Sequence, residues 1–226
     1  MADKVSKKEL KEPDFLQVEF RRMTAFLSRN QSKAYFILAI FFLILAGAAG
    51  WSLYRMNYEK SALKIYNQVE ALASKLSSQS EKGELIEGFR NVAFKYPNSQ
   101  SGLHAYYQLG NLYFQMNQID LSIRAYDEFI KRAPKSNNYL KIFANTGKGY
   151  CYEVKKDFKK ALLSFQTSLK ISEAKIFEGQ IYRDMGRVYE EMNDKKNALE
   201  YYRKSLEKTN DPTMLIIIKR KIASLS

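Results

Sequence analysis

The distribution of charged and apolar residues sets one apolar run apart from the rest of the chain. Residues 34–54 contain no charged side chain, and Lys33 and Arg55 bound the run. As an α-helix, these 21 residues are about 31 Å long, enough to cross the hydrocarbon core of a bilayer. Tyr35 near one end and Trp51 near the other suit the two membrane interfaces. The pattern predicts a single transmembrane helix over residues 34–54.

After this run, glycine, tyrosine, small and aromatic residues recur three times at the same spacing. Three glycines are each followed by a tyrosine after three residues, a small residue after twelve and an aromatic residue after sixteen. The sets are Gly110, Tyr113, Ser122 and Tyr126; Gly149, Tyr152, Ala161 and Phe165; and Gly186, Tyr189, Ala198 and Tyr202. The glycines lie 39 and 37 residues apart, close to the ~34-residue period of a helical repeat.

The spacing has a physical reason. Two antiparallel helices approach closely only where a small residue on one meets a bulky residue on the other. Glycine weakens a helix by roughly 1 kcal/mol, so its recurrence indicates close backbone approach. Turn-like stretches at 117–118, 156–157 and 193–194 separate each glycine from the small residue that follows it. We therefore expect a helix on each side of each turn.

The copy from Leu103 to Ser136 resembles the tetratricopeptide repeat family, with Tyr106, Leu109, Gly110, Tyr113, Ser122, Tyr126 and Pro134 on the family's pattern. Two further copies lie at about 142–175 and 179–212, and a degenerate fourth unit at about 58–98. This resemblance covers about two thirds of the chain. It implies an all-α fold: a solenoid of three to four antiparallel helix pairs closed by a C-terminal capping helix.

In that family the first helix of each pair lines a concave groove that binds other proteins. Carried over at fixed offsets from the glycines, the resemblance implies a groove lined by His104, Tyr107, Asn111, Phe114, Phe143, Tyr150, Glu153, Arg183 and Arg187. Four of these, Tyr107, Phe114, Phe143 and Tyr150, are the expected aromatic anchors for a partner. The family's peptide-carboxylate clamp is not supported, because Tyr107 replaces its lysine.

The predicted elements divide the chain into five parts. They are a tail at 1–33 with an amphipathic segment, the transmembrane helix at 34–54, a degenerate helix pair at 55–102, three repeats at 103–212 and a capping helix at 213–226. In the tail, Leu16, Phe20, Met23 and Leu27 share one helical face, which suits either a membrane surface or a membrane partner. The capping helix begins at Asp211-Pro212, and its stripe is Met214, Ile218, Ile222 and Leu225.

Flanking charge predicts the orientation of the span. Arg21, Arg22, Arg29 and Lys33 precede it closely, whereas Arg55, Lys60 and Lys64 follow it and weaken the contrast. The positive-inside rule then favours a cytoplasmic amino terminus and a periplasmic repeat domain. Ala46-Gly47-Ala48 resembles a cleavage site, but the 33 residues before the apolar run are long for a signal peptide. We favour an uncleaved anchor, with cleavage as the alternative.

The charge distribution and the reactive residue types argue against several classes of function. The formal net charge is +13, but it is spread along the chain, so we expect no nucleic-acid binding. Cys151 is the one cysteine, flanked by tyrosines, and we interpret it as a packing residue. His104 is the one histidine, and nothing near it completes a metal site or a catalytic triad. We expect no catalytic residue, no metal and no cofactor.

The order of tail, single span and repeats resembles the ancillary subunits of the SecYEG translocon in bacterial inner membranes. Anchored repeat scaffolds of the periplasmic flagellar motor are similar. These resemblances imply a single-pass, non-enzymatic scaffold of the bacterial cell envelope, bound to other proteins of a membrane complex and to the bilayer through residues 34–54. Self-association stays open, since Ala46 and Gly50 form a small-xxx-small pair. The alternative is a chaperone-like module that holds unfolded periplasmic clients.

Overall fold

The computed structural model describes residues 15–73 and 82–225, and the side chains of Phe15, Leu16 and Leu27 are outside the description. The first 14 residues of the expected tail lie outside the described residues. All regular structure within the described ranges is helical, which confirms the all-α prediction. The chain forms two compact units, Met1–Met56 and Asn57–Ser226, and we describe each by itself.

The first unit contains α1 (Phe15–Arg29) and the first part of α2 (Gln31–Ala73). Asn30 forms a turn between them. The uncharged run lies within α2 and its side chains are almost all exposed. Judged by length and composition alone, α2 is the one described helix that is long and apolar enough to cross a membrane.

The end of the uncharged run is not the end of a helix. No proline or glycine occurs between Trp51 and Ala73, and α2 continues through this segment to Ala73. From Asn57 onward it belongs to the second unit, where Ala62, Tyr66 and Val69 are buried. The sequence did not predict that the span and the first repeat helix are one element.

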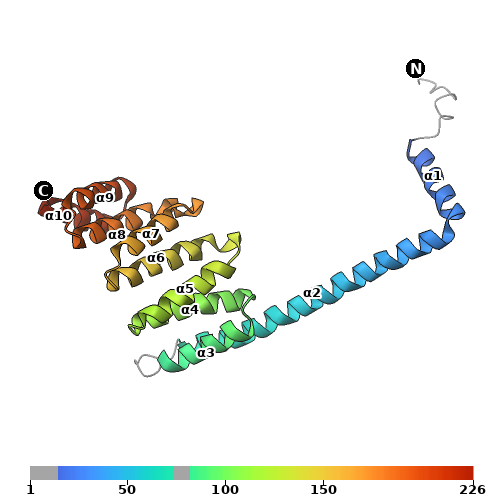
Figure 1. The fold of residues 1–226 in the computed structure, drawn as a ribbon, viewed down its shortest axis with the longest axis horizontal. Helices are drawn as coiled ribbons and strands as arrows, with labels where there is room; N and C mark the ends of the chain where they lie inside the picture. The colour runs from blue at the N-terminus through green and yellow to red at the C-terminus, as the bar shows by residue number, and fades with distance from the viewer. Residues whose placement is uncertain (1–14, 74–81, 226) are drawn as a thin grey trace, which may run out of the picture. The chain divides into compact units, whose positions relative to one another are not determined.

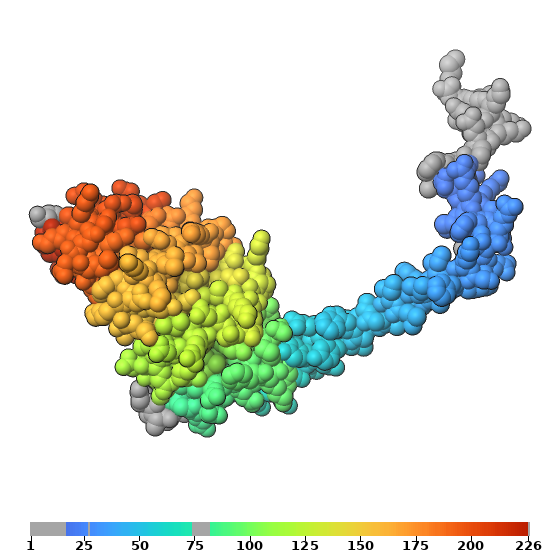
Figure 2. All heavy atoms as spheres, viewed as in Figure 1, coloured from blue at the N-terminus to red at the C-terminus, as the bar shows by residue number. Residues whose placement is uncertain are grey.

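The second unit is a stack of helix pairs, coloured from cyan through green to red along the chain in Figures 1 and 2. After α2 come α3 (Lys82–Lys95), α4 (Gln100–Gln115), α5 (Ile119–Arg132), α6 (Asn138–Val154), α7 (Phe158–Leu169), α8 (Glu178–Glu191), α9 (Lys195–Lys208) and α10 (Pro212–Leu225). Short 3-10 helices, η2 (Lys135–Asn137) and η3 (Ser172–Phe177), precede α6 and α8. The pairs α4–α5, α6–α7 and α8–α9 correspond to the three expected repeats.

The close approach expected at each repeated glycine is present. A Cβ atom on Gly110 would lie 2.5 Å from the Tyr126 ring, and one on Gly149 would lie 2.4 Å from the Phe165 ring. At Gly186 the corresponding distance to Tyr202 is 2.8 Å. No side chain fits at these distances, so glycine is required where the first helix of a pair meets the aromatic residue of the second.

The turns within the repeats share one backbone conformation. Asn117, Lys156 and Asn193 have φ angles of 58°, 61° and 59°. In each turn the following backbone N–H donates to the carbonyl of the tyrosine three residues after the glycine, as from Gln118 to Tyr113 at 2.8 Å. This left-handed residue ends the first helix and lets the chain reverse into the second.

The last helix closes the stack as expected. The Asp211 carboxylate accepts hydrogen bonds from the backbone N–H groups of Thr213 (2.8 Å) and Met214 (3.3 Å). The stripe of Met214, Ile218, Ile222 and Leu225 packs in a cluster with Ala198 and Tyr202. Ile216 and Ile217, which are surplus to that stripe, are exposed. Cys151 is fully buried beside Ser122, which fits its interpretation as a packing residue.

Candidate protein-binding groove

The first helices of the repeats bring most of the expected groove residues together. A pocket of about 370 Å³ between α4, α6 and the start of α8 is lined by Tyr107, Asn111, Phe114, Phe143 and Tyr150. An adjoining pocket of about 480 Å³ is lined by Phe114, Tyr150, Glu153 and Arg187. Phe114 and Tyr150 line both pockets, so the two pockets form one groove with two ends. We call the first pocket the amide end and the adjoining pocket the charged end.

The amide end is built from uncharged polar groups. The Tyr126 hydroxyl donates to Asn111 Oδ1 at 2.7 Å, and Asn111 Nδ2 donates to Gln108 Oε1 at 3.3 Å. Burial raises the pKa of Tyr126, with the neighbouring Cys151 and Tyr107 adding to the shift, so the hydroxyl stays a donor at neutral pH. Gln115 and Gln180 complete the polar lining of this pocket. This end therefore offers hydrogen bonds without a formal charge.

The four expected aromatic anchors differ in how tightly their rings are held. The centre of the Tyr107 ring lies 6.1 Å from that of Tyr126 and 5.8 Å from that of Phe129. Tyr107 of α4 therefore packs against α5 as well as lining the groove. Phe143 lies edge-on to Phe177 at 4.9 Å and is 38% exposed. Phe114 is half-buried and borders both pockets.

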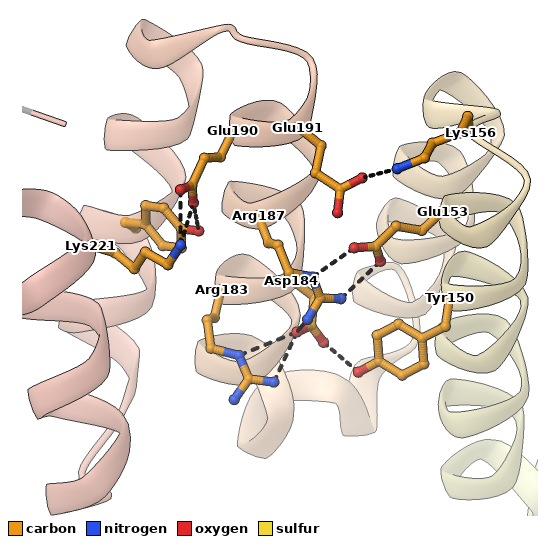
Figure 3. Close-up of polar contacts among 10 residues, drawn as sticks. Tyr150, Glu153, Lys156, Arg183, Asp184, Arg187, Glu190, Glu191 and Lys221 are labelled. Atoms are coloured by element: carbon orange, nitrogen blue, oxygen red, sulfur yellow. Dashed lines mark hydrogen bonds and ion pairs between the residues drawn. The ribbon is translucent and has the colours of Figure 1, made fainter. Parts of the chain in front are cut away.

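At the charged end a single arginine joins two helices. Arg187 of α8 donates from Nε and Nη2 to the two carboxylate oxygens of Glu153 on α6, at 2.7 and 2.8 Å (Figure 3). Burial alone would lower the pKa of Arg187, but the hydrogen bonds to Glu153 and the charge of Asp184 raise it overall. The guanidinium also lies 5.5 Å from the centre of the Tyr150 ring. It therefore stays charged and holds α6 and α8 together.

The Asp184 carboxylate lies below this pair in Figure 3 and is fully buried. It accepts from the Tyr150 hydroxyl at 2.5 Å and from Arg183 Nε and Nη2 at 3.2 and 2.8 Å (Figure 3). Arg187 Nη1 lies 3.5 Å from the same carboxylate. Burial and Asp184 raise the pKa of Tyr150. Asp184 thus anchors Tyr150 and both predicted arginines, although no spacing in the sequence marks it as a site residue.

Two further ion pairs extend this network along α8. Glu191 accepts from Lys156 at 3.3 Å, and Glu190 accepts from Lys221 of α10 at 2.8 and 3.0 Å (Figure 3). The Tyr202 hydroxyl donates to Glu190 at 2.7 Å. The charged end therefore consists of groups that already pair with one another.

Of the expected groove residues, Arg183 lines neither pocket, and the same is true of His104. Its ring faces Tyr66 of α2, with the ring centres 6.2 Å apart. It therefore contacts the first helix pair instead of lining either end of the groove. Within the described residues no group of three or more metal-ligating side chains gathers.

A further depression lies away from the groove, between α3, α4 and α5. It has a volume of about 790 Å³, and Phe94 and Arg90 of α3, Tyr106 of α4, and Leu121 and Arg124 of α5 are among its lining residues. No spacing in the sequence marks this depression, because its lining residues come from two different helix pairs.

Comparison with known proteins agrees with this architecture. A family model described as a tetratricopeptide repeat-like domain matches residues 24–226. No curated protein matches the chain. A crystal structure of MamA protein is similar with a TM-score of 0.56 and 15% identity, covering 72% of this chain and 81% of that one. MamA 41-end from Desulfovibrio magneticus RS-1 gives a TM-score of 0.55 and 15% identity, covering 73% and 88%. At such identities the likeness concerns the fold alone.

Proposed function

We propose that this chain, which belongs to the tetratricopeptide repeat-like domain family, is a membrane-anchored, non-enzymatic scaffold of the bacterial cell envelope. Proteins of this fold family typically bind other proteins. The observation that carries the proposal is α2, which is apolar and exposed over residues 34–54 and then continues as the first helix of the repeats. No linker separates the proposed anchor from the first helix pair.

The proposed topology is a cytoplasmic amino terminus, one span in the inner membrane and a periplasmic repeat domain. The support is the cluster of Arg21, Arg22, Arg29 and Lys33 before the span. Uncleaved anchoring is supported by the continuity of α2, because cleavage near Ala48 would cut inside a helix.

The proposed partner site is the groove. At its charged end Glu153 and Asp184 already pair with Arg187 and Arg183, so a partner gains little from a charged side chain there. At the amide end the rings of Phe114 and Phe143 border uncharged donors and acceptors. These features favour a segment that inserts an apolar side chain and hydrogen-bonds through its backbone.

Photo-crosslinking in intact cells tests this proposal. A crosslinking residue replacing Phe114 or Phe143 should capture one or two discrete proteins. The matched control is Leu163, an exposed apolar residue of the second helix α7. If positions 114 and 143 capture nothing while the span or Ile216 and Ile217 capture the partner, the groove is the wrong surface.

The identity of the partner complex follows from the same experiment. The translocon and the periplasmic flagellar motor are the two candidate assemblies, supported by the order of tail, span and repeats. Capture of a translocon subunit or of a motor component at residue 114 would choose between them. Capture of a protein from neither assembly would reject both.

A chaperone-like module is the second candidate function. The observation in its favour is apolar surface outside the groove, namely Ile216 and Ile217 on α10. A holdase should bind many unfolded chains weakly, whereas a scaffold should co-purify with a fixed partner at constant stoichiometry. Isolation of the full chain in mild detergent distinguishes the two.

A further inference from the structure

The amphipathic helix α1 carries an apolar face that no described part of the chain covers. Phe20, Met23 and Phe26 lie along one side of α1 and are 64%, 56% and 59% exposed. Together with Glu19 they line one shallow depression on the surface of the helix. Three large apolar side chains on one short helix form a face that water solvates poorly.

The opposite side of α1 is basic and small. At 100° per residue, Arg21, Ala25 and Arg29 fall opposite the apolar face. Arg22 lies at the boundary, where its Nη1 donates to Glu19 at 2.8 Å. Between Phe15 and the start of the uncharged run there are four cations, Arg21, Arg22, Arg29 and Lys33, and a single carboxylate, Glu19. The segment is therefore both amphipathic and strongly basic.

The apolar face of α1 lies close along the chain to the uncharged run. Only Asn30 separates α1 from α2, and Ala34 begins the run four residues after Asn30 begins the turn. Backbone hydrogen bonds continue across the turn, from Asn30 N to Phe26 O at 3.1 Å and from Ala34 N to Asn30 O at 2.9 Å. Four helical residues rise about 6 Å. The polar headgroup layer on each side of a bilayer has a similar thickness, about 5–8 Å.

We propose that α1 lies in the headgroup layer of the cytoplasmic leaflet, with Phe20, Met23 and Phe26 inserted toward the acyl chains and its arginines on anionic lipid. The occupant of this face is lipid, because the helix is tethered within that layer and its charge complements an anionic surface. This inference rests on the proposed membrane anchor. It adds a second membrane contact that is parallel to the surface.

The test uses the full chain in lipid vesicles with an environment-sensitive fluorophore on a single introduced cysteine. Cys151 is fully buried, so labelling is directed to the new site. The test variants are Phe20→Cys, Met23→Cys and Phe26→Cys. The matched controls on the opposite side of the same helix are Ala25→Cys and Ser28→Cys. Each is quenched separately by nitroxide-labelled lipid and by aqueous iodide.

We expect lipid quenching at positions 20, 23 and 26 to exceed that at 25 and 28 at least twofold, with iodide showing the reverse order. The contrast should be larger in vesicles containing one quarter phosphatidylglycerol than in pure phosphatidylcholine. Equal accessibility at all five positions would overturn the proposal and leave a protein partner as the cover for this face. A contrast that is the same in both lipids would overturn the assigned role of the arginines.

A label at Leu43→Cys, in the middle of the uncharged run, separates this inference from the proposed anchor. If position 43 is quenched by lipid while positions 20, 23 and 26 are quenched by iodide, the anchor stands and the surface helix is wrong. If position 43 is itself quenched by iodide, the proposed anchor fails.

Discussion

The two parts of α2 belong to one continuous helix but differ in how their apolar side chains are arranged around it. Over residues 34–54 apolar side chains surround the whole helix, and they are exposed. From Asn57 to Ala73 the buried residues are Ala62, Tyr66 and Val69, spaced four and three apart on one face. A helix that is apolar all round requires an apolar environment on every side, whereas a single stripe requires one packed neighbour. The periodicity of the side chains, and not the helix itself, distinguishes the proposed anchor from the scaffold.

The largest expected effect comes from placing charge in the first part of α2. Leu43→Arg with Ile44→Arg should prevent membrane insertion, because each arginine at a helix centre costs about 2.5–3.5 kcal/mol. Extraction of membranes with alkaline carbonate measures the attached fraction. The control is Leu63→Arg with Asn67→Arg, two exposed positions in the second part of the same helix. Retention of the first variant in the membrane, at the level of the control, would contradict the anchor.

The next effect tests the second part of α2. Ala62 is fully buried and the adjacent Leu63 is 50% exposed. In the fragment 57–226, Ala62→Arg should lower the free energy of unfolding by about 3 kcal/mol or more, because it buries an unpaired charge. Leu63→Arg should change it by less than about 0.5 kcal/mol. Denaturant unfolding measures both, and equal effects would mean that the assigned face of the helix is wrong.

Local spacing explains why the repeats were predictable. Gly110, Gly149 and Gly186 recur at fixed distances from an aromatic residue in the next helix, and each contact joins neighbouring helices of one pair. The left-handed turn residues Asn117 and Asn193 lie in the stretches that the sequence marked as turns. Contacts within one pair repeat along the sequence, and the pattern can be read without the structure.

The missed features depend on contacts between pairs. Asp184 is buried because Tyr150, 34 residues earlier, and the adjacent Arg183 supply its hydrogen bonds. Nothing around Asp184 in the sequence distinguishes it from a solvated acid. His104 was assigned to the groove by its offset, but Tyr66 of the degenerate pair lies against it. The residues that bind a partner in the groove remain a prediction.

A smaller effect is expected on partner affinity when the apolar lining of the groove is changed. Phe114→Ser with Phe143→Ser should weaken binding of the crosslinked partner by at least ~2 kcal/mol, because buried aromatic anchors dominate such interfaces. Tyr107 is less suitable for this test, since its ring packs against Phe129. Leu163→Ser is the control, and binding affinity of the purified partner is the measurement. Unchanged affinity in the double variant would place the binding site elsewhere.

The smallest effect concerns the attachment of α10. Burial would raise the pKa of Glu190, but hydrogen bonds from Lys221 and Tyr202 hold it below its ordinary value of 4.5. A carboxylate with a lowered pKa stabilises the fold above its unfolded pKa, and this contribution is lost as the pH falls below about 4.5. Lys221→Met should cost about 0.5–1 kcal/mol at pH 7, since the pair is partly exposed.

The same variant should approach the stability of the unmodified protein in acid. Denaturant unfolding at pH 7 and at pH 3 measures this difference, with Lys219→Met as the control on the same helix. A cost that is equal at both pH values would show that Lys221 acts by packing and not by its charge.

The compartment of the repeat domain decides whether the proposed function is possible, because an anchored periplasmic scaffold requires its repeats outside the cytoplasm. A reporter that is active only in the periplasm, fused after Ser226, measures this in growing cells. We expect strong activity, and none from a reporter at the same position that is active only in the cytoplasm. Activity of the cytoplasmic reporter alone would contradict the proposed orientation and remove the periplasmic partners with it.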